Sequence, residues 1–295
     1  MDDYPITCYE HDVLPERLRE IPQPPRALWA RGGIPDPSHL LLTVVGSRKA
    51  TPYGIAACNE LIASLAGLPV SIVSGLALGI DACAHEAALR ARMHCIAIPG
   101  SGLHEQVLAP AQHRLLATRI LAAGGCLLSP FPPTHHATKY SFPARNRIMV
   151  GMSHAVLVIE ATEKSGTLIT ARLAAEYNRE LGVVPGSIFA PGSAGPHQFL
   201  TLGATPIYNA ASLRELLGLR EAPTLPYSTT TQTTPSLPTH AVQILETLVE
   251  PLTVSAIQAQ TKLETSTLQA ALTLLEIQGY VTRAHGRIQR HQLPT

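Results

Sequence analysis

Small residues and cations stand in this chain where they could hold phosphate, directly after apolar runs that we expect to form strands. Two such groups follow the runs that end at Val45 and near Glu160: Gly46, Ser47 and Arg48, and Lys164, Ser165, Gly166 and Thr167. The N–H groups of small residues, next to a cation and a helix N-terminus, bind anions well. Similar loops at 74–81 and 99–102 lack the cation. At one sheet edge, four such loops predict a long anion-binding groove.

A second group of residues, at 139–147, suits a single strand of nucleic acid. Three cations and two aromatic rings lie there, although only 4% of the chain is aromatic, and the residues of interest are Lys139, Phe142, Arg145, Asn146 and Arg147. Cations can follow phosphates, while rings stack on bases for about 1–3 kcal/mol each. A structural alternative stays open, in which Phe142 packs on the core and the arginines pair with acids such as Glu160.

The elements that must position these residues alternate along the chain. A continuous apolar run at 40–45 predicts a buried strand, and the pattern recurs in short, largely apolar stretches at 70–74, 94–99, 125–129, 154–160 and 182–185. Helical stretches are expected between them, at 53–66, 80–93, 112–122, 144–151 and 167–181. This alternation is typical of a mostly parallel sheet, and predicts an α/β, Rossmann-like doubly wound domain over residues 38–220. The Pro-rich residues 1–37 are interpreted as an irregular N-terminal arm laid over that core.

The last part of the chain predicts a second, smaller domain. Residues 221–239 are rich in Thr, Ser and Pro and are interpreted as a linker. Three helical stretches and a hairpin then follow over 240–295, a pattern typical of a winged helix, with Gly279 ending the third helix. That helix carries no Arg or Lys, which suits contact with protein better than reading of the DNA major groove.

Composition sets limits on function. The 295 residues include 22 Lys and Arg against 21 Asp and Glu, so binding through bulk charge is disfavoured while a local basic groove is permitted. No apolar run is long enough for a membrane helix, and the acidic first residues do not resemble a signal peptide. Five scattered cysteines without a C-x-x-C pair indicate reduced thiols in the cytoplasm. The histidines show no zinc spacing, and we expect no metal, cofactor or small-molecule substrate.

Several segments together resemble the DprA/Smf family, DNA-processing protein A. They are VGSRKATPYG (45–54), SGLALGIDACAHEAAL (74–89), PGSGL (99–103), FPARNRIMVGMS (142–153) and VIEATEKSGTLITARLAAE (158–176). The resemblance implies a protein without catalysis that binds single-stranded DNA in natural transformation, protects the incoming strand and loads the RecA recombinase. It also implies a homodimer formed through the Rossmann domain, and DNA binding by the residues of the 46–48, 139–147 and 164–167 groups named above.

The chain departs from the family pattern at His104, Pro130 and His197. Two other hypotheses remain. One is a nucleotide-processing phosphoribohydrolase, although the stretch 164–170 lacks that group's leading glycines and glutamate. The other is a transcription regulator that reads duplex DNA through the hairpin arginines Arg283, Arg287 and Arg290. No complete dinucleotide fingerprint, Walker A motif or G-x-S-x-G elbow is present.

Overall fold

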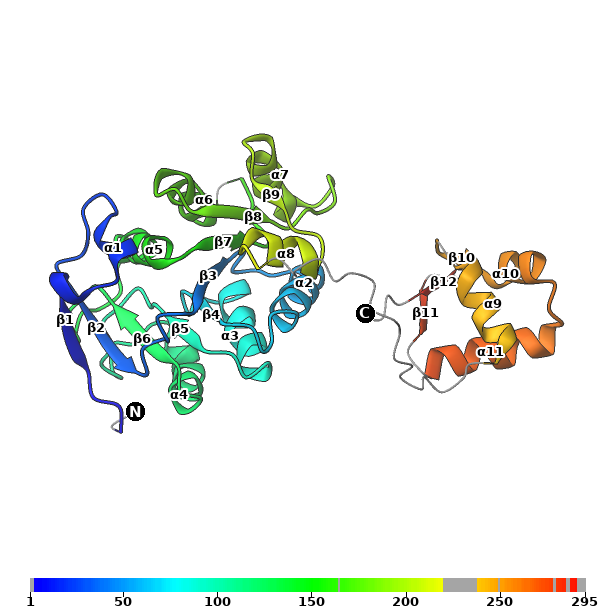
Figure 1. Ribbon diagram of the computed structural model, residues 1–295, viewed down its shortest axis with the longest axis horizontal. Coiled ribbons are helices and arrows are strands. Elements are labelled where there is room, and N and C mark those ends of the chain that lie inside the picture. Colours follow the sequence, from blue (N-terminus) through cyan, green and yellow to red (C-terminus); the bar gives the residue numbers. More distant parts are fainter. Residues whose placement is uncertain are drawn as a thin grey trace. The chain divides into compact units, whose positions relative to one another are not determined.

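The computed structural model describes residues 3–163, 165–219, 238–248, 250–277, 280–284 and 287–290 (Figure 1). The chain divides into two compact units, residues 1–222 and 223–295. The elements of the first unit alternate between strands and helices, which confirms the predicted α/β, Rossmann-like fold. In the part of the chain that the structure describes, no helix combines the length and the apolar character needed to cross a membrane.

The first unit is built on one sheet. Within the described residues it has nine strands in the order β1-β2-β6-β5-β4-β3-β7-β8-β9, and all pairs from β6 to β9 are parallel. The strands are β1 (Thr7–Glu10), β2 (Ala27–Gly32), β3 (Leu40–Val45), β4 (Val70–Ser74), β5 (Cys95–Ala97), β6 (Cys126–Ser129), β7 (Ala155–Val158), β8 (Glu180–Val183) and β9 (Thr205–Pro206). Chain order runs outward from β3 in one direction and from β7 in the other. The strand order therefore reverses between β3 and β7.

Helices cover both faces of this sheet (Figure 1). One face packs against α2 (Pro52–Ala63), α3 (Ile80–Arg90), α4 (Arg114–Ala122) and α8 (Ala210–Leu216). The other packs against α1 (Glu16–Arg19), α5 (Ser141–Met152), α6 (Thr167–Glu176) and α7 (Ala194–Thr201). Short 3-10 turns lie at η1 (His11–Val13), η2 (Ala111–His113) and η3 (Pro191–Ser193). Because the central strands are buried on both faces, their sequences are the continuous apolar runs expected of a parallel sheet.

The N-terminal residues differ from the irregular arm that we expected. β1 and β2 extend the main sheet, since β2 pairs with β6 and β1 pairs with β2, both antiparallel. Leu28 and Ala30 of β2 are buried, while Trp29 between them is half-buried. Prolines on both sides of β2 obscure this short run in the sequence. Residues 7–10 and 27–32 are therefore part of the α/β core.

Several helix boundaries also differ from expectation, and the start of one helix matters for function. α5 begins at Ser141, three residues before the expected start, because Pro143 fits within a first turn that needs no N–H donor. Much of the segment 139–147, which carries the three cations and two aromatic rings, is therefore helical. α6 ends at Glu176, and Asn178 adopts a left-handed backbone (φ 52°) before β8 begins at Glu180. The expected helix over 167–181 was wrong beyond residue 176.

The second unit has the predicted winged-helix elements. They are α9 (Thr239–Thr247), α10 (Val254–Thr261), α11 (Thr265–Ile277) and a sheet of β10 (Leu252–Thr253), β12 (Arg287–Arg290) and β11 (Val281–Ala284). Ile244, Leu268, Leu272 and Ile288 pack in its core. The end of the third helix at Gly279 and most of the predicted linker, residues 221–237, lie outside the described residues.

Candidate nucleic-acid interface

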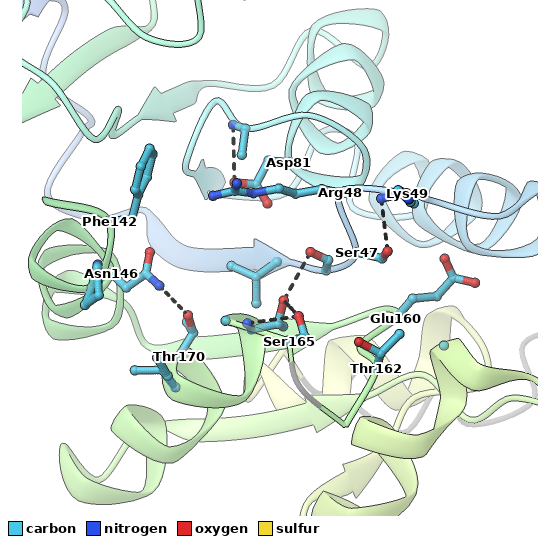
Figure 2. Close-up of a pocket in the computed structure, with 18 of the residues that line it drawn as sticks. Ser47, Arg48, Lys49, Asp81, Phe142, Asn146, Glu160, Thr162, Ser165 and Thr170 are labelled. Carbon is cyan, nitrogen blue, oxygen red and sulfur yellow. Dashed lines mark hydrogen bonds between the residues drawn. The ribbon is translucent and has the colours of Figure 1, made fainter. Parts of the chain in front are cut away.

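A groove opens where the strand order reverses, at the carboxyl ends of β3 and β7. It encloses about 650 Å³ and is lined by the loop after β3, the first turns of α3 and α5, and the turn before α6 (Figure 2). In open α/β sheets, ligands bind at this topological switch point because two neighbouring loops diverge there. The groove thus gathers residues that are more than a hundred positions apart in the sequence.

The loop after β3 supplies two exposed cations, Arg48 and Lys49. The N–H of Lys49 donates to Ser47 Oγ over 3.1 Å, and Ile80 N–H donates to the Ser47 carbonyl over 3.1 Å. Gly79 allows this close approach: its φ is 76°, and a Cβ there would lie 2.2 Å from the Ser47 oxygen. The loop is therefore held from below by the start of α3, while its cations face solvent.

Phe142 stands across the groove from this loop, on the first turn of α5. Its ring is half-buried, and the Arg48 guanidinium lies 5.2 Å from the ring centroid. Gly100 lies against the ring, since a Cβ at that position would be 2.7 Å from a ring carbon. The alternative in which Phe142 packs on the core is therefore only partly right, because one part of the ring is buried and another part is exposed to solvent. A cation and an aromatic face meet here at the surface.

Arg145 lies beneath the groove and is almost completely buried. Its Nη1 donates to the Ile98 carbonyl over 2.9 Å and lies 3.8 Å from a carboxylate oxygen of Asp81. Asp81 also accepts from the N–H of Gly75, over 3.1 Å. Burial raises the pKa of Asp81 and lowers the pKa of Arg145, and the ion pair opposes both shifts. Arg145 pairs with this acid and not with Glu160, and it supports the floor of the groove.

The turn before α6 joins the two sides of the groove. Thr167 Oγ1 donates to the Gly46 carbonyl over 3.1 Å, and Ser165 Oγ donates to Thr167 Oγ1 over 2.9 Å. Gly166 is exposed with open space around it, so its backbone is accessible. Asn146 on α5 donates to Thr170 Oγ1 over 3.0 Å, which ties α5 to α6. Lys164, which precedes Ser165 in the sequence, lies outside the described residues.

Two of the expected DNA-binding residues do not line the groove. Arg147 projects from another side of α5, where its Nε donates to the Tyr177 hydroxyl over 3.0 Å and its Nη1 donates to Gln23 Oε1 over 3.0 Å. It also donates to the Pro22 carbonyl, so it fastens the N-terminal residues to α5. Lys139 is exposed before α5, with its Nζ 4.9 Å from the Tyr140 ring centroid.

Sequence reasoning missed the groove cation Lys49 and expected a different partner for the acid Glu160. Lys49 directly follows Arg48, and its place in the same loop was the available signal. Glu160, at the end of β7, accepts a hydrogen bond from the N–H of Thr51 over 3.0 Å and another from the Thr51 hydroxyl. Thr51 is the N-cap of α2, so the Glu160 carboxylate occupies the positive end of that helix. Glu160 therefore fixes the far end of the loop that carries both cations.

The comparisons with known proteins match this chain to one family over most of its length. The sequence profile of DNA recombination-mediator protein A matches residues 5–218, which is more than half of the chain. The chain belongs to the DNA recombination-mediator protein A family. A second profile, the DprA winged helix domain, matches residues 228–287. These two matches correspond to the α/β unit that carries the groove and to the winged-helix unit.

Named relatives and solved structures agree with that membership. Protein Smf of Escherichia coli is 40% identical over 219 residues, and the match covers 74% of this chain but only 58% of that protein. DNA processing protein DprA of Bacillus subtilis is 38% identical over 201 residues, covering 68% of this chain and 67% of the relative. The crystal structure of DprA from Streptococcus pneumoniae aligns with a TM-score of 0.66 at 34% identity, covering 71% of this chain and 74% of that one.

A further solved structure concerns nucleic acid directly. DNA processing protein A from Helicobacter pylori, described for its single-stranded DNA binding mode, aligns with a TM-score of 0.62 at 29% identity. The alignment covers 72% of this chain and 94% of that protein. The three departures from the family pattern, His104, Pro130 and His197, are not among the residues that line the groove.

Proposed function

We propose that the groove binds single-stranded DNA. The observation that carries this proposal is the exposed Arg48 guanidinium 5.2 Å from the centroid of the Phe142 ring, with a second exposed cation, Lys49, next to Arg48 in the same groove-lining loop. Cations beside an accessible aromatic face are what single strands need, because phosphates and unpaired bases are both exposed there. Membership of the DNA recombination-mediator family and the single-stranded DNA binding described for the Helicobacter pylori relative support it.

In the bound state, Arg48 and the ring of Phe142 contact different parts of one nucleotide, its phosphate and its base. Arg48 leaves the ring and binds a phosphate together with Lys49, and the freed face of Phe142 stacks on a base. The exposed backbone at Gly166 offers a further phosphate contact at the start of α6. Lys164 in the same turn, and Lys139 beyond the groove, extend the track of cations along the strand.

Arg145, Asn146 and Arg147 support this surface in different ways. Arg145 holds the floor through Asp81, and Asn146 holds α5 against α6. Arg147 holds the N-terminal residues on another side of α5. We assign the direct DNA contacts to Gly46, Ser47, Arg48, Lys49, Phe142 and the turn 164–167.

The wider role that we propose rests on the resemblance to the DprA/Smf family. The protein acts in natural transformation in the cytoplasm, protects incoming single-stranded DNA and loads the RecA recombinase, as a homodimer formed through the α/β unit. The groove supports the proposed protection of single-stranded DNA, since a strand bound in it is shielded from nucleases. Nuclease digestion of a labelled single strand, and RecA filament formation on a coated strand, test protection and loading separately.

Binding itself is tested by fluorescence anisotropy with labelled oligo-dT and with duplex DNA of equal length. Phe142→Ala should weaken binding to the single strand by about 5- to 150-fold, which corresponds to about 1–3 kcal/mol for one stacked base. Phe131→Ala is the matched control, because Phe131 is also half-buried but stacks on His135 outside the groove. Equal affinity for duplex DNA, or equal losses in both variants, would contradict the proposal. Release of a free base from a nucleoside monophosphate would instead favour a phosphoribohydrolase.

A further inference from the structure

An uncharged loop, residues 185–192, follows β8 and carries an exposed aromatic ring. Phe189 is 89% exposed, the largest value among the bulky apolar side chains in the described part of the chain, and Ile188 beside it is 80% exposed. A phenylalanine ring in water forgoes the stabilisation that burial gives. The chain has four phenylalanines, and Phe189 belongs to neither core of the α/β unit. The ring is therefore free to contact a ligand.

Hydrogen bonds hold the loop in a defined turn. The Ala190 N–H donates to the Ser187 carbonyl over 3.0 Å, and the Phe189 N–H donates to Ser187 Oγ over 3.2 Å. At the start of the loop, the hydroxyl of Tyr53 on α2 donates to the Pro185 carbonyl. The loop is thus fixed both within itself and to the neighbouring helix, and the ring of Phe189 projects from it into solvent.

The loop is continuous with the groove. Its last residues, Pro191 and Gly192, line the groove, and the Cα atom of Phe189 lies within about 7.6 Å of that of Pro191 because only one residue separates them. Gly192 stands next to Glu160, since a Cβ at Gly192 would be 3.6 Å from the Glu160 carboxylate. Figure 2 shows Glu160 and Phe142 at opposite ends of the pocket. Phe189 therefore extends the groove at the end away from Phe142.

The chemistry of the loop fits the base of a nucleotide. Residues 185–192, PGSIFAPG, carry no charge, so the loop neither attracts nor repels a phosphate. Every base offers a flat face that can stack on an aromatic ring, and single-strand binders present several such rings along one path. An exposed ring beyond each end of the cation-bearing loop would contact two nucleotides of the same strand, with the phosphates between them near Arg48 and Lys49.

We propose that the ring of Phe189 is a second base-stacking platform, which a later nucleotide of the strand contacts where the strand leaves the groove. This inference rests on the proposed binding of single-stranded DNA in the groove. It adds a direction to that proposal, because the strand then crosses the switch point from Phe142 to Phe189. Ile188 widens the apolar surface beside the ring. Stacking on both rings is tolerant of base sequence, as a binder of any single strand requires.

Photocrosslinking tests where the bases lie. Oligo-dT carrying a single 5-iododeoxyuridine, placed at each position in turn, is bound to the full-length chain and irradiated, and the modified residue is identified by mass spectrometry. We expect adducts at Phe142 from some positions and at Phe189 from positions always nearer the same end of the strand. Adducts at Phe142 with none at Phe189 would overturn the second platform and leave the groove in place. Adducts at neither ring would contradict the groove as well.

Binding measurements on variants test the energy of the contact. Phe189→Ala should weaken binding of long oligo-dT by about 5- to 150-fold, with an unchanged salt slope because no charge is removed. Oligo-dT too short to reach from Phe142 should bind this variant and the wild type equally, and Phe189→Trp should keep the wild-type affinity for long strands.

Phe131→Ala is again the matched control, because its ring lies outside the groove. Equal losses for short and long strands in Phe189→Ala would overturn the proposal. Wild-type affinity of Phe189→Ala for long strands would also overturn it, and an altered elution volume in size-exclusion chromatography would then assign the ring to contact between protein chains.

Discussion

The salt dependence of DNA binding should report Arg48 as a single phosphate contact. Each cation that neutralises one phosphate of a single strand adds about 0.7 to the slope of log affinity against log salt concentration. Between about 50 and about 200 mM salt, one contact therefore weakens binding by about 2.6-fold. Arg48 and Lys49 are exposed in the groove and together contribute about 1.4 to the slope. Arg48→Ala should lower the magnitude of the slope by about 0.7.

Anisotropy titrations of labelled oligo-dT at several salt concentrations measure this slope. Arg48→Lys retains the charge and should keep the wild-type slope, whereas the variant with both Arg48→Ala and Lys49→Ala should lose about 1.4. Arg19→Ala removes an exposed cation of α1, which lies outside the groove, and is the matched control. An unchanged slope in Arg48→Ala, or an equal change in Arg19→Ala, would refute the assignment of Arg48 to phosphate.

Three other predictions concern the framework beneath the groove. Asp81→Asn leaves the Arg145 guanidinium buried without its ion-pair partner and should lower the free energy of unfolding in urea by about 3–5 kcal/mol. Gly75→Ala places a Cβ 1.2 Å from Arg145 Nη1 and should also destabilise, whereas Gly166→Ala meets open space and should change stability by less than about 0.5 kcal/mol. Burial lowers the pKa of His85 to about 3, so the unfolded chain, with a histidine pKa of about 6.5, binds a proton that the folded chain does not. The stabilising contribution of neutral, buried His85 is complete above about pH 6.5, and the free energy of unfolding should fall by about 1.4 kcal/mol for each pH unit below that, toward about pH 3. Urea titrations at different pH values measure this loss, and His85→Leu should remove it.

The strands around the switch point could be predicted because their burial leaves a simple mark in the sequence. Leu40–Val45 (LLLTVV) is an almost continuous apolar run, Val70–Ser74 (VSIVS) combines apolar residues with small serines, and the structure has fully or largely buried strands at both positions. Thr51 followed by Pro52 marks the start of α2, with the Thr51 side chain accepting from the Gly54 N–H. Both signals are local, since burial on two faces and helix capping depend on residues close in sequence. Once the strands are placed, the parallel topology alone predicts the position of the groove, at the carboxyl ends of the strands where the strand order reverses.

The roles of Arg145 and Arg147 could not be separated from the sequence. Two residues apart on a helix, they point about 200° away from each other. One therefore reaches Asp81 beneath the groove, and the other reaches Gln23 near the N-terminus. The sequence pattern places the helix start only at Ala144, and the partners lie 64 and 124 residues away. Long-range pairing of this kind leaves no local pattern from which to predict it.

The charges in the groove explain how a chain with a net charge of +1 can offer a basic surface. Two acids line the groove, but neither faces it unpaired. Asp81 is buried against Arg145, so these two charges cancel beneath the surface. The Glu160 carboxylate is held by the N–H and hydroxyl of Thr51, where the positive end of α2 offsets part of its charge. The exposed charges among the described lining residues are then those of Arg48 and Lys49. Among the described residues that line the groove, an entering phosphate meets two exposed cations and no exposed carboxylate. The near-neutral total does not weaken that local attraction, because charges more than about 10 Å away are screened by salt.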